Sequence, residues 1–297
     1  MKSHPSFKYL VLLGIAALML LASCGRPPTT SIAPTESTLH RINREGVLRV
    51  GYGVWAPFSQ ENVSETEPSK RVSGFSIDLV QEIANRAEPK LKVEFVRFNW
   101  ATVKADIESG RFDVIAEPLF LTVPRAQIFA FSRPYARFGV ACAIVRADDN
   151  RFKSFADLDR DDITVALAEG WTSTDYAKAN LTKPKFKMVL LRENNFAQLE
   201  DVLFGRADVA LQDAPTVLQF AQAHQGKVKA LWLDTPPSMV AGAFAVRPGD
   251  ADLVAFLNAS LEILEADGTL ARLDRKWKTQ GFYEERRFRA GTGLANP

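Results

Sequence analysis

Histidine and cysteine are scarce in this chain of 297 residues, which has three histidines and two cysteines. His4 lies in an N-terminal leader and His40 in a stretch that we expect to be a linker, so only His224 belongs to the expected folded body. A Ser–His–Asp or Cys–His nucleophile system and a multi-histidine metal site are therefore excluded. The composition favours binding over catalysis, and we expect no catalytic residue, no metal and no cofactor.

Net charge is also small, because 37 basic residues face 35 acidic ones and leave a formal charge of +2. Such a balance gives no strong field for nucleic acid, and we expect no nucleic-acid partner. No run of 18 or more apolar residues occurs, which excludes a retained multi-span membrane protein. The length suits one large or two medium domains of a globular protein.

The N-terminus has the composition of an export signal. Lys2 and Lys8 precede an apolar run over 10–22, which is too short for a comfortable membrane span. The run ends in Leu-Ala-Ser-Cys24 and resembles the lipobox of bacterial lipoproteins, in which the cysteine is lipidated and becomes the mature N-terminus. The alternative is a short anchor followed by an incidental cysteine. We predict a lipoprotein signal peptide over 1–24 and, from the Pro, Thr and Ser that follow, a flexible tether over 25–45.

One motif occurs twice in the body. The stretch Gly-Arg-Phe-Asp-Val-Ile begins at Gly110, and Gly-Arg-Ala-Asp-Val-Ala begins at Gly205. Each follows a predicted helix and opens an apolar strand, and each strand ends in polar or aromatic residues before a new helix start. The repeat predicts two similar lobes that each direct a strand end at a shared cleft.

Strands and helices alternate along the whole chain, which predicts an α/β fold with mostly parallel sheets flanked by helices. Two apolar runs, 138–145 and 241–246, interrupt the alternation and are expected to carry the chain between the lobes. We therefore predict lobe 1 from 46–137 plus 242–280, lobe 2 from 138–241, and a charged tail over 281–297.

Several short motifs follow one another along the body. They are Leu48–Gly51 before an aromatic-x-Pro-Phe loop, Gly74–Leu79, the strand after Gly110, Phe131–Tyr135, Gly170–Thr172 and Ala266–Thr269. With these motifs the chain resembles, over about residues 46–278, the solute-binding lipoproteins of ABC importers that take polar amino acids. This resemblance implies a two-lobed periplasmic-binding-protein fold with a hinge, a small-molecule ligand, an ABC transporter permease as partner, and a monomer held at the membrane by its N-terminal lipid. It implies a location in the periplasm or at the cell surface.

The family resemblance also implies roles for individual residues. Arg125 matches the arginine that grips the α-carboxylate of the ligand, Thr172 adds donors, and Asp213 matches the acid that meets the ligand amine. Trp55 and Trp100 match aromatics that sandwich the ligand side chain. Each has a structural alternative: Asp213 is also a suitable helix N-cap, Arg125 a surface residue and Trp55 a core aromatic.

The strand end after Ala116 departs from the family pattern. Glu117, Pro118 and Phe120 stand where small and hydroxyl residues are usual, and Trp171 replaces a small residue in lobe 2. Lost donors, added aromatic faces and added negative charge favour a cationic or amine-bearing ligand. Alternatively, Glu117 pairs with Arg125 and neutralises it. The expected ligand-binding residues are Trp55, Phe58, Trp100, Glu117, Phe120, Arg125, Trp171, Thr172 and Asp213.

Two other classes of function remain open. Some relatives resemble cyclohexadienyl dehydratases, for which Glu117 or Glu169 could supply the acid. The third class is a ligand-sensing module that signals through a partner.

Overall fold

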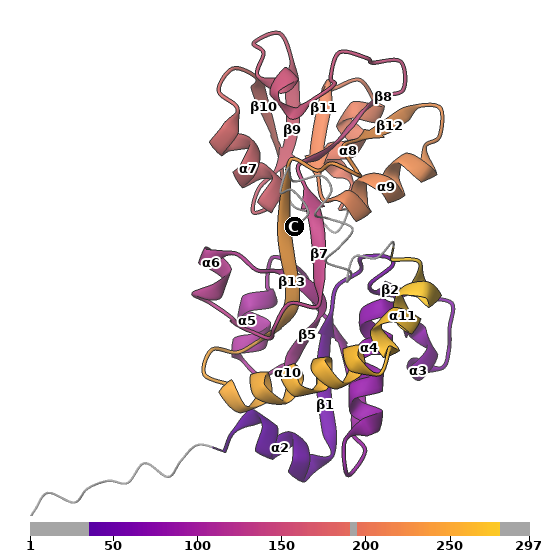
Figure 1. Cartoon of the computed structure of the whole chain (residues 1–297), viewed down its shortest axis with the longest axis vertical. Coiled ribbons are helices and arrows are strands. Elements are labelled where there is room, and N and C mark those ends of the chain that lie inside the picture. Colours follow the sequence, from indigo (N-terminus) through magenta and orange to yellow (C-terminus); the bar gives the residue numbers. More distant parts are fainter. Residues whose placement is uncertain (1–35, 191–194, 280–297) are drawn as a thin grey trace, which may run out of the picture. The chain divides into compact units, whose positions relative to one another are not determined.

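The computed structural model describes residues 36–190 and 195–279, and its first sheet contains six strands. Five of them follow the order β4-β1-β5-β13-β6, and the sixth, β7, pairs with β13 (Figure 1). β1 is parallel to β4 and β5, whereas β13 is antiparallel to β5, β6 and β7. The strand bounds are β1 Val47–Tyr52, β4 Lys92–Arg97, β5 Val114–Phe120, β6 Ala130–Phe131, β7 Ala136–Val140 and β13 Ser238–Val246.

Helices cover this sheet because each presents apolar residues at helical spacing. In α4 (Phe75–Arg86) the residues Leu79, Val80 and Ile83 are buried, while Asp78 on the other side binds Lys276 and Trp277 of α11. We call this sheet and its helices lobe 1. Its other elements are α2 Thr38–Glu45, β2 Gln60–Glu61, α3 Pro68–Arg71, β3 Val72–Ser73, α5 Val103–Glu108, α6 Val123–Ala126, α10 Ala251–Ala266 and α11 Thr269–Trp277.

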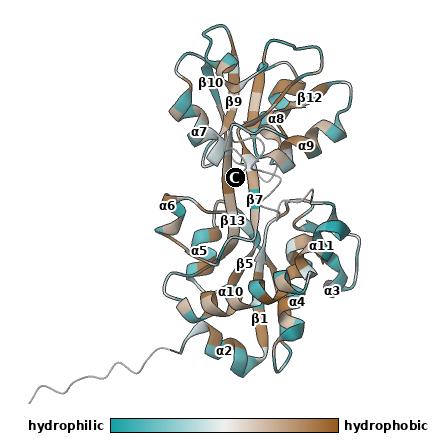
Figure 2. Ribbon diagram, in the orientation of Figure 1, coloured by the Kyte–Doolittle hydropathy of each residue, from teal (hydrophilic) through white to brown (hydrophobic). Residues whose placement is uncertain are grey.

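The second sheet has the order β10-β9-β11-β8-β12 and, with its helices, forms lobe 2. β9 is parallel to β10 and β11, and β8 is antiparallel to β11 and β12. Alternate residues of its strands enter two separate apolar clusters, so both faces are buried. Figure 2 shows hydrophobic residues along these strands. The elements are β8 Cys142–Arg146, η1 Phe155–Leu158, β9 Thr164–Ala168, α7 Thr172–Asn180, β10 Lys185–Val189, α8 Ala197–Leu203, β11 Val209–Gln212, α9 Ala214–Ala223 and β12 Val228–Leu231.

The two crossings of the chain between the sheets lie side by side. β7 leads from lobe 1 toward β8, and β13 returns after β12, and the two strands pair antiparallel from Ala136↔Gly242 to Val140↔Ser238. The chain therefore changes sheets at Ala141 and again between 231 and 238. The expected boundaries at 138 and 241 fall inside β7 and β13, the two paired crossing strands.

Both copies of the repeated motif make the same hydrogen bonds. Asp113 accepts from the N–H of Arg49 on β1 at 2.9 Å, and Asp208 accepts from the N–H of Thr164 on β9 at 2.9 Å. Their own N–H groups donate back to the carbonyls of the same residues, at 2.8 and 2.9 Å. The aspartate of each copy thus ties the start of one strand to its parallel neighbour, and β5 and β11 run on from equivalent positions.

The expected tether over 25–45 is wrong for its last eight residues. Residues 38–45 form α2, which Ser37 caps by accepting from the N–H of His40 and which Gly46 ends in a left-handed conformation. Ile42 is fully buried in the core of lobe 1. The two apolar residues of α2, Leu39 and Ile42, both pack on the core of lobe 1, and a helix of eight residues with only this pair is held by the body more than by its own periodicity.

The expected signal peptide, the lipidated Cys24, the rest of the tether and the charged tail over 281–297 lie outside the described residues. Within the described ranges, no helix combines the length and the apolar character that crossing a membrane requires.

Candidate ligand-binding site

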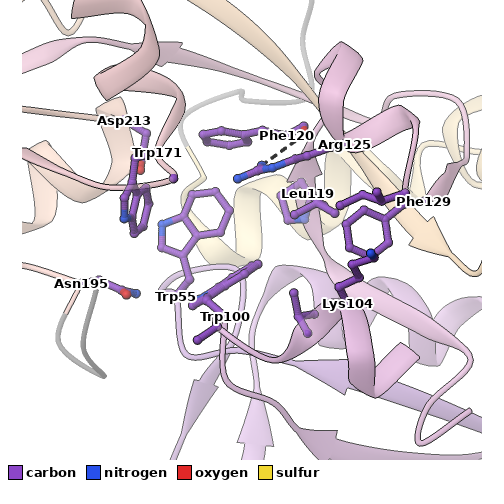
Figure 3. A pocket seen from close by; sticks show the side chains of 15 residues that line it. Trp55, Trp100, Lys104, Leu119, Phe120, Arg125, Phe129, Trp171, Asn195 and Asp213 are labelled. Atoms are coloured by element: carbon purple, nitrogen blue, oxygen red, sulfur yellow. Dashed lines mark hydrogen bonds between the residues drawn. The ribbon is translucent and has the colours of Figure 1, made fainter. Parts of the chain in front are cut away.

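A cavity of about 280 Å³ is lined by residues of both lobes (Figure 3). Lobe 1 contributes side chains from the loop after β1, from α5 and the residues before it, from the end of β5, and from α6 and the turn after it. Lobe 2 contributes the turn before α7, the N-cap of α9 and Asn195. The lining residues are Trp55, Trp100, Ala101, Val103, Lys104, Pro118, Leu119, Phe120, Arg125, Ile128, Phe129, Gly170, Trp171, Asn195 and Asp213.

Four expected aromatic residues lie in this lining: Trp55, Trp100, Phe120 and Trp171. The backbone of Trp55 bonds in both directions with Ser59 across a tight loop, which directs the indole toward the cavity. The indole ring lies 5.8 Å from Phe120, edge to face, and its Nε1 donates to Thr216 of lobe 2 at 3.3 Å. The aromatic side of the cavity is thus held in place by packing within lobe 1 and by one hydrogen bond to lobe 2.

Arg125 lines the cavity at the start of α6, where Thr122 accepts from its backbone N–H at 3.4 Å. Its guanidinium donates to the carbonyl of Phe120 at 3.3 Å, as the dashed line in Figure 3 marks. Burial lowers the pKa of this guanidinium from its usual value. Within the described ranges no carboxylate lies at salt-bridge distance from it, although the charge of Asp175 in lobe 2 acts on it in the opposite direction to burial, so a half-buried cation without a bonded carboxylate faces the cavity. A ligand carboxylate is the group that such a site fits.

Asp213 is fully buried and lines the same cavity. Its Oδ1 caps α9 by accepting from the N–H of Thr216 at 3.0 Å, while its Oδ2 has no hydrogen-bond partner among the described residues. Burial raises the pKa of this carboxyl to about 6. Asp213 can therefore cap the helix and bind a ligand at the same time: one oxygen caps α9, and the other can accept a hydrogen bond from a ligand.

Glu117 does not line the cavity. It is fully buried behind it, where its Oε1 accepts from the N–H of Gly53 at 2.9 Å and its Oε2 has no partner among the described residues. Burial raises the pKa of Glu117 to about 8, so the group is mostly neutral at pH 7. Neither expectation for Glu117 describes this position, because in the described chain it makes no ion pair with Arg125 and presents no charge to the cavity.

Two further expected residues lie beside the cavity but outside its lining. Phe58 is buried behind Trp55, with the ring centroids 4.6 Å apart. Thr172 is the first residue of α7 and follows Trp171, which is in the lining. Glu169, the other acid considered for an enzyme, is a surface residue that pairs with Lys178 at 3.6 Å.

Several lining residues carried no signal in the sequence. Leu119, Ile128 and Phe129 have the composition of ordinary core residues, and the turn that returns Ile128 and Phe129 to the cavity depends on N–H bonds to the carbonyl of Arg125, at 3.0 and 2.9 Å. Among the described residues there is also no group of three or more His, Cys, Asp or Glu side chains that could hold a metal ion.

These features define an α/β receptor of two lobes, joined by paired crossing strands, with a small-molecule cavity lined by both. The chain belongs to the bacterial extracellular solute-binding proteins, family 3, whose model matches residues 48–280. Its fold is that of the two-domain periplasmic amino-acid-binding proteins, and the family places it outside the cytoplasm.

Among curated relatives, the chain is 29% identical to a cyclohexadienyl dehydratase of Pseudomonas aeruginosa over 273 residues, which covers 92% of this chain and 95% of that protein. It is 30% identical to an amino-acid-binding protein of Dichelobacter nodosus over 218 residues, with coverage of 72% and 83%. An L-cystine-binding protein of Bacillus subtilis is 27% identical over 274 residues, with coverage of 90% and 96%.

Two solved structures are similar in fold. One is an ancestral amino-acid-binding protein described as a precursor of cyclohexadienyl dehydratase, with a TM-score of 0.69, 32% identity, and coverage of 81% of this chain and 99% of that one. The other is a putative ABC-transporter binding component of Wolinella succinogenes in complex with lysine, with a TM-score of 0.68, 26% identity and coverage of 81% and 97%.

Proposed function

We propose that this protein is a lipid-anchored receptor that binds a free amino acid or a related amine in the cavity between its lobes and delivers it to an ABC importer. One observation carries the proposal. The guanidinium of Arg125 and the Oδ2 of Asp213, neither of which bonds an oppositely charged group among the described residues, line one cavity from opposite lobes. A carboxylate and an ammonium group on neighbouring atoms of one ligand can satisfy both at once.

The same geometry supports a binding cycle. A charge-assisted hydrogen bond between Arg125 and a ligand carboxylate contributes about 1.5–3 kcal/mol. Because Arg125 belongs to lobe 1 and Asp213 to lobe 2, a ligand that contacts both favours whichever arrangement of the lobes brings them together. Ligand binding thereby changes the population of a form that a membrane partner can recognise.

The delivery step and the anchor rest on family resemblance and on the leader. Relatives include a probable amino-acid ABC transporter-binding protein of Haemophilus influenzae, 27% identical over 238 residues. Cys24 follows an apolar run of signal-peptide length, and its lipidation would hold a monomeric receptor at the membrane surface, in the periplasm or on the cell surface, beside a permease.

The binding function is tested by calorimetry with the purified protein and a panel of amino acids and amines, after native mass spectrometry for a co-purified ligand. Arg125→Ala should weaken the best ligand by about 100-fold, which corresponds to about 2.7 kcal/mol. Arg125→Lys should recover only part of this, since a lysine cannot make two parallel bonds to a carboxylate. A panel without any binder, or an Arg125→Ala variant with unchanged affinity, would reject the proposal.

Anchoring has its own test. Cys24→Ser should abolish incorporation of labelled palmitate and release the protein from membranes, whereas the matched variant Cys142→Ser should change neither. Cys142 is suitable as the control because it is fully buried in lobe 2. Membrane retention of the Cys24→Ser protein would contradict lipid anchoring.

A dehydratase is the second candidate, and two observations favour it: the similarity to the Pseudomonas enzyme and the cavity position of Asp213, an acid with a pKa near neutrality. Incubation with a cyclohexadienyl acid, prephenate or arogenate, separates the two candidates. The receptor function predicts no product above the uncatalysed rate. Catalysed loss of water and carbon dioxide that disappears in Asp213→Asn would establish the enzyme instead.

A further inference from the structure

We infer that the ligand of this cavity is a zwitterionic amino acid with an uncharged apolar side chain, and that a wall of lobe 1 forms the subsite for that side chain. This inference rests on the proposed function, because it takes the head-group sites at Arg125 and Asp213 as given. The wall consists of Trp100, Val103, Leu119, Ile128 and Phe129, which all line the cavity.

These five residues form one continuous surface. Val103, Leu119 and Phe129 belong to a single buried apolar cluster of lobe 1, and Trp100 and Ile128 pack against that cluster. They come from three places: Trp100 and Val103 from the region of α5, Leu119 from β5, and Ile128 and Phe129 from the turn after α6. Removing an apolar side chain from water against such a surface is favourable in proportion to the area covered.

The polar groups lie at the other end of the cavity. Figure 3 shows Asp213 and Trp171 on one side, and Leu119, Phe129 and Lys104 on the other, with the guanidinium of Arg125 directed away from Phe129 toward Trp55. A head group placed between Arg125 and Asp213 therefore extends its side chain toward the apolar wall.

Charge balance among the described residues disfavours a second charge on the ligand. Of these residues, Asp213 is the only carboxylate in the lining, and the ammonium group of the ligand uses it. Glu117, which would serve a cationic side chain, accepts from Gly53 behind the wall. A cationic side chain would thus enter a cavity that already holds Arg125, without a second lining carboxylate in the described part of the chain to compensate for its lost hydration.

The described lining also offers little to stabilise a negatively charged side chain of the ligand. Apart from Arg125, the basic residue of the described lining is Lys104, whose side chain is 54% exposed and lies 3.7 Å from Glu108 on the next turn of α5. An exposed lysine next to a carboxylate contributes little to an anion. The wall is therefore suited to leucine, methionine, phenylalanine and similar side chains.

Calorimetry with the purified protein tests the inference against L-leucine, L-methionine and L-phenylalanine on one side and L-lysine, L-arginine and L-glutamate on the other. At least one apolar amino acid should bind tenfold or more tightly than each of the charged ones. Tighter binding of lysine, arginine or glutamate would overturn the side-chain assignment and leave the receptor function intact. Binding of none of the six, or tighter binding of an amine without a carboxylate, would overturn the head-group assignment as well.

A substitution locates the subsite. Ile128→Asp places a carboxylate on the wall at a half-exposed position, so it should weaken the best apolar ligand at least tenfold and strengthen lysine relative to leucine. Val123→Asp is the matched control, because Val123 is 80% exposed on α6 and outside the cavity lining, and its affinities should match those of the wild type.

Thermal unfolding of both variants establishes that they fold. If Ile128→Asp does not fold, Ile128→Ala serves instead. It should weaken a large apolar ligand about threefold to tenfold, through the contact area lost, without affecting glycine. Unchanged relative affinities in a folded Ile128 variant would show that the side chain of the ligand lies elsewhere.

Discussion

The two copies of the Gly-Arg-x-Asp-Val motif begin their strands in the same way, but the residues that follow the two strands differ. Asp113 and Asp208 make matching bonds to the strand beside them, so β5 and β11 start alike. After the four strand residues, lobe 1 continues as Pro118-Leu119-Phe120, whereas lobe 2 continues as Asp213-Ala214-Pro215 and enters a helix. The repeat therefore sets the position of each strand, while the residues that follow the strand set the chemistry of each side of the cavity.

The largest difference in stability between the two lobes is expected where the motif packs against the neighbouring strand. In lobe 1 a Cβ at Gly51 would lie 2.7 Å from the ring of Phe112, while lobe 2 has Ala166 and Ala207 at the corresponding positions. Phe112→Ala should cost about 3–5 kcal/mol of unfolding free energy, because its ring is fully buried.

The matched substitutions complete this experiment. Gly51→Ala should cost about 1–3 kcal/mol alone, from overpacking, and much less when Phe112→Ala is present. Ala166→Gly in lobe 2 should cost only about 0.5–1 kcal/mol. Urea unfolding of the single and double variants measures all three, and full additivity of Gly51→Ala and Phe112→Ala would contradict the proposed contact.

Substitution of the two aspartates compares directly how much the shared hydrogen bonds stabilise each lobe. Asp113 is 4% exposed in its side chain and pairs with Arg41 as well as the Arg49 N–H, so Asp113→Ala should cost about 3 kcal/mol. Asp208 is 25% exposed and screened by solvent, so Asp208→Ala should cost only about 1 kcal/mol. Equal losses in urea unfolding would show that burial does not distinguish the two copies.

The strand ends differ in how their acids respond to pH. The pKa of Asp213 is raised to about 6 in the folded protein, so the folded state holds its proton more tightly than the unfolded chain does. The free energy of unfolding should therefore fall as pH rises from about 4 to about 6, by an amount on the order of 2–3 kcal/mol for this group.

Asp213→Asn isolates that contribution. Asparagine can still cap α9 but carries no charge, so at pH 7.5 the variant should be more stable than the wild type by about 2 kcal/mol and should bind the ligand at least tenfold more weakly. Wild-type affinity for an ammonium group should also weaken below pH 6, as Asp213 becomes protonated. A variant that is less stable at pH 7.5 would contradict the cost assigned to the buried charge.

Glu117 should give the smallest effect on ligand affinity. At pH 6 its carboxyl is neutral in the folded protein, so Glu117→Gln should change ligand affinity by less than threefold. At pH 4 the carboxyl is also mostly neutral in the unfolded chain, so there the free energy of unfolding should change by less than about 0.5 kcal/mol. Because the folded pKa is raised to about 8, the wild type should lose stability relative to the variant as pH rises from about 4.5 to about 8. The exposed Glu94→Gln serves as a control without such a pH dependence, and a large loss of affinity in Glu117→Gln at pH 6 would show that Glu117 contacts the ligand.

Much of the architecture could be predicted because it is local. Helical spacing over 75–86, the two repeated motifs and the apolar crossings predicted the alternation of elements and the two lobes, as the structure has them. Residues 38–45 could not be predicted, since their helix depends on the burial of Ile42 by distant parts of lobe 1.

Some residues of the site could likewise be predicted from the sequence, and others could not. Trp55, Trp100, Arg125 and Asp213 could be chosen because they match ligand-binding positions of the family that the chain resembles, and because they stand in loops or at helix starts, where strand ends usually meet a ligand. The direction of Glu117 could not, because β5 is buried on both faces and shows no alternation that would tell which way a side chain points. The apolar wall could not be found either, since side chains that line a cavity and side chains that fill a core have the same composition.

The pairing of β7 with β13 makes lobe 2 an insertion within the chain of lobe 1. The chain leaves lobe 1 at Val140 and re-enters it at Ser238, and these two residues are direct partners in the ladder. Exchange of the whole segment between relatives therefore needs only two junctions at a single location, and leaves the fold of lobe 1 closed without it. A chimaera could keep the half of the amino-acid site that lobe 1 provides and receive lobe 2, with the residue at position 213, from a different receptor.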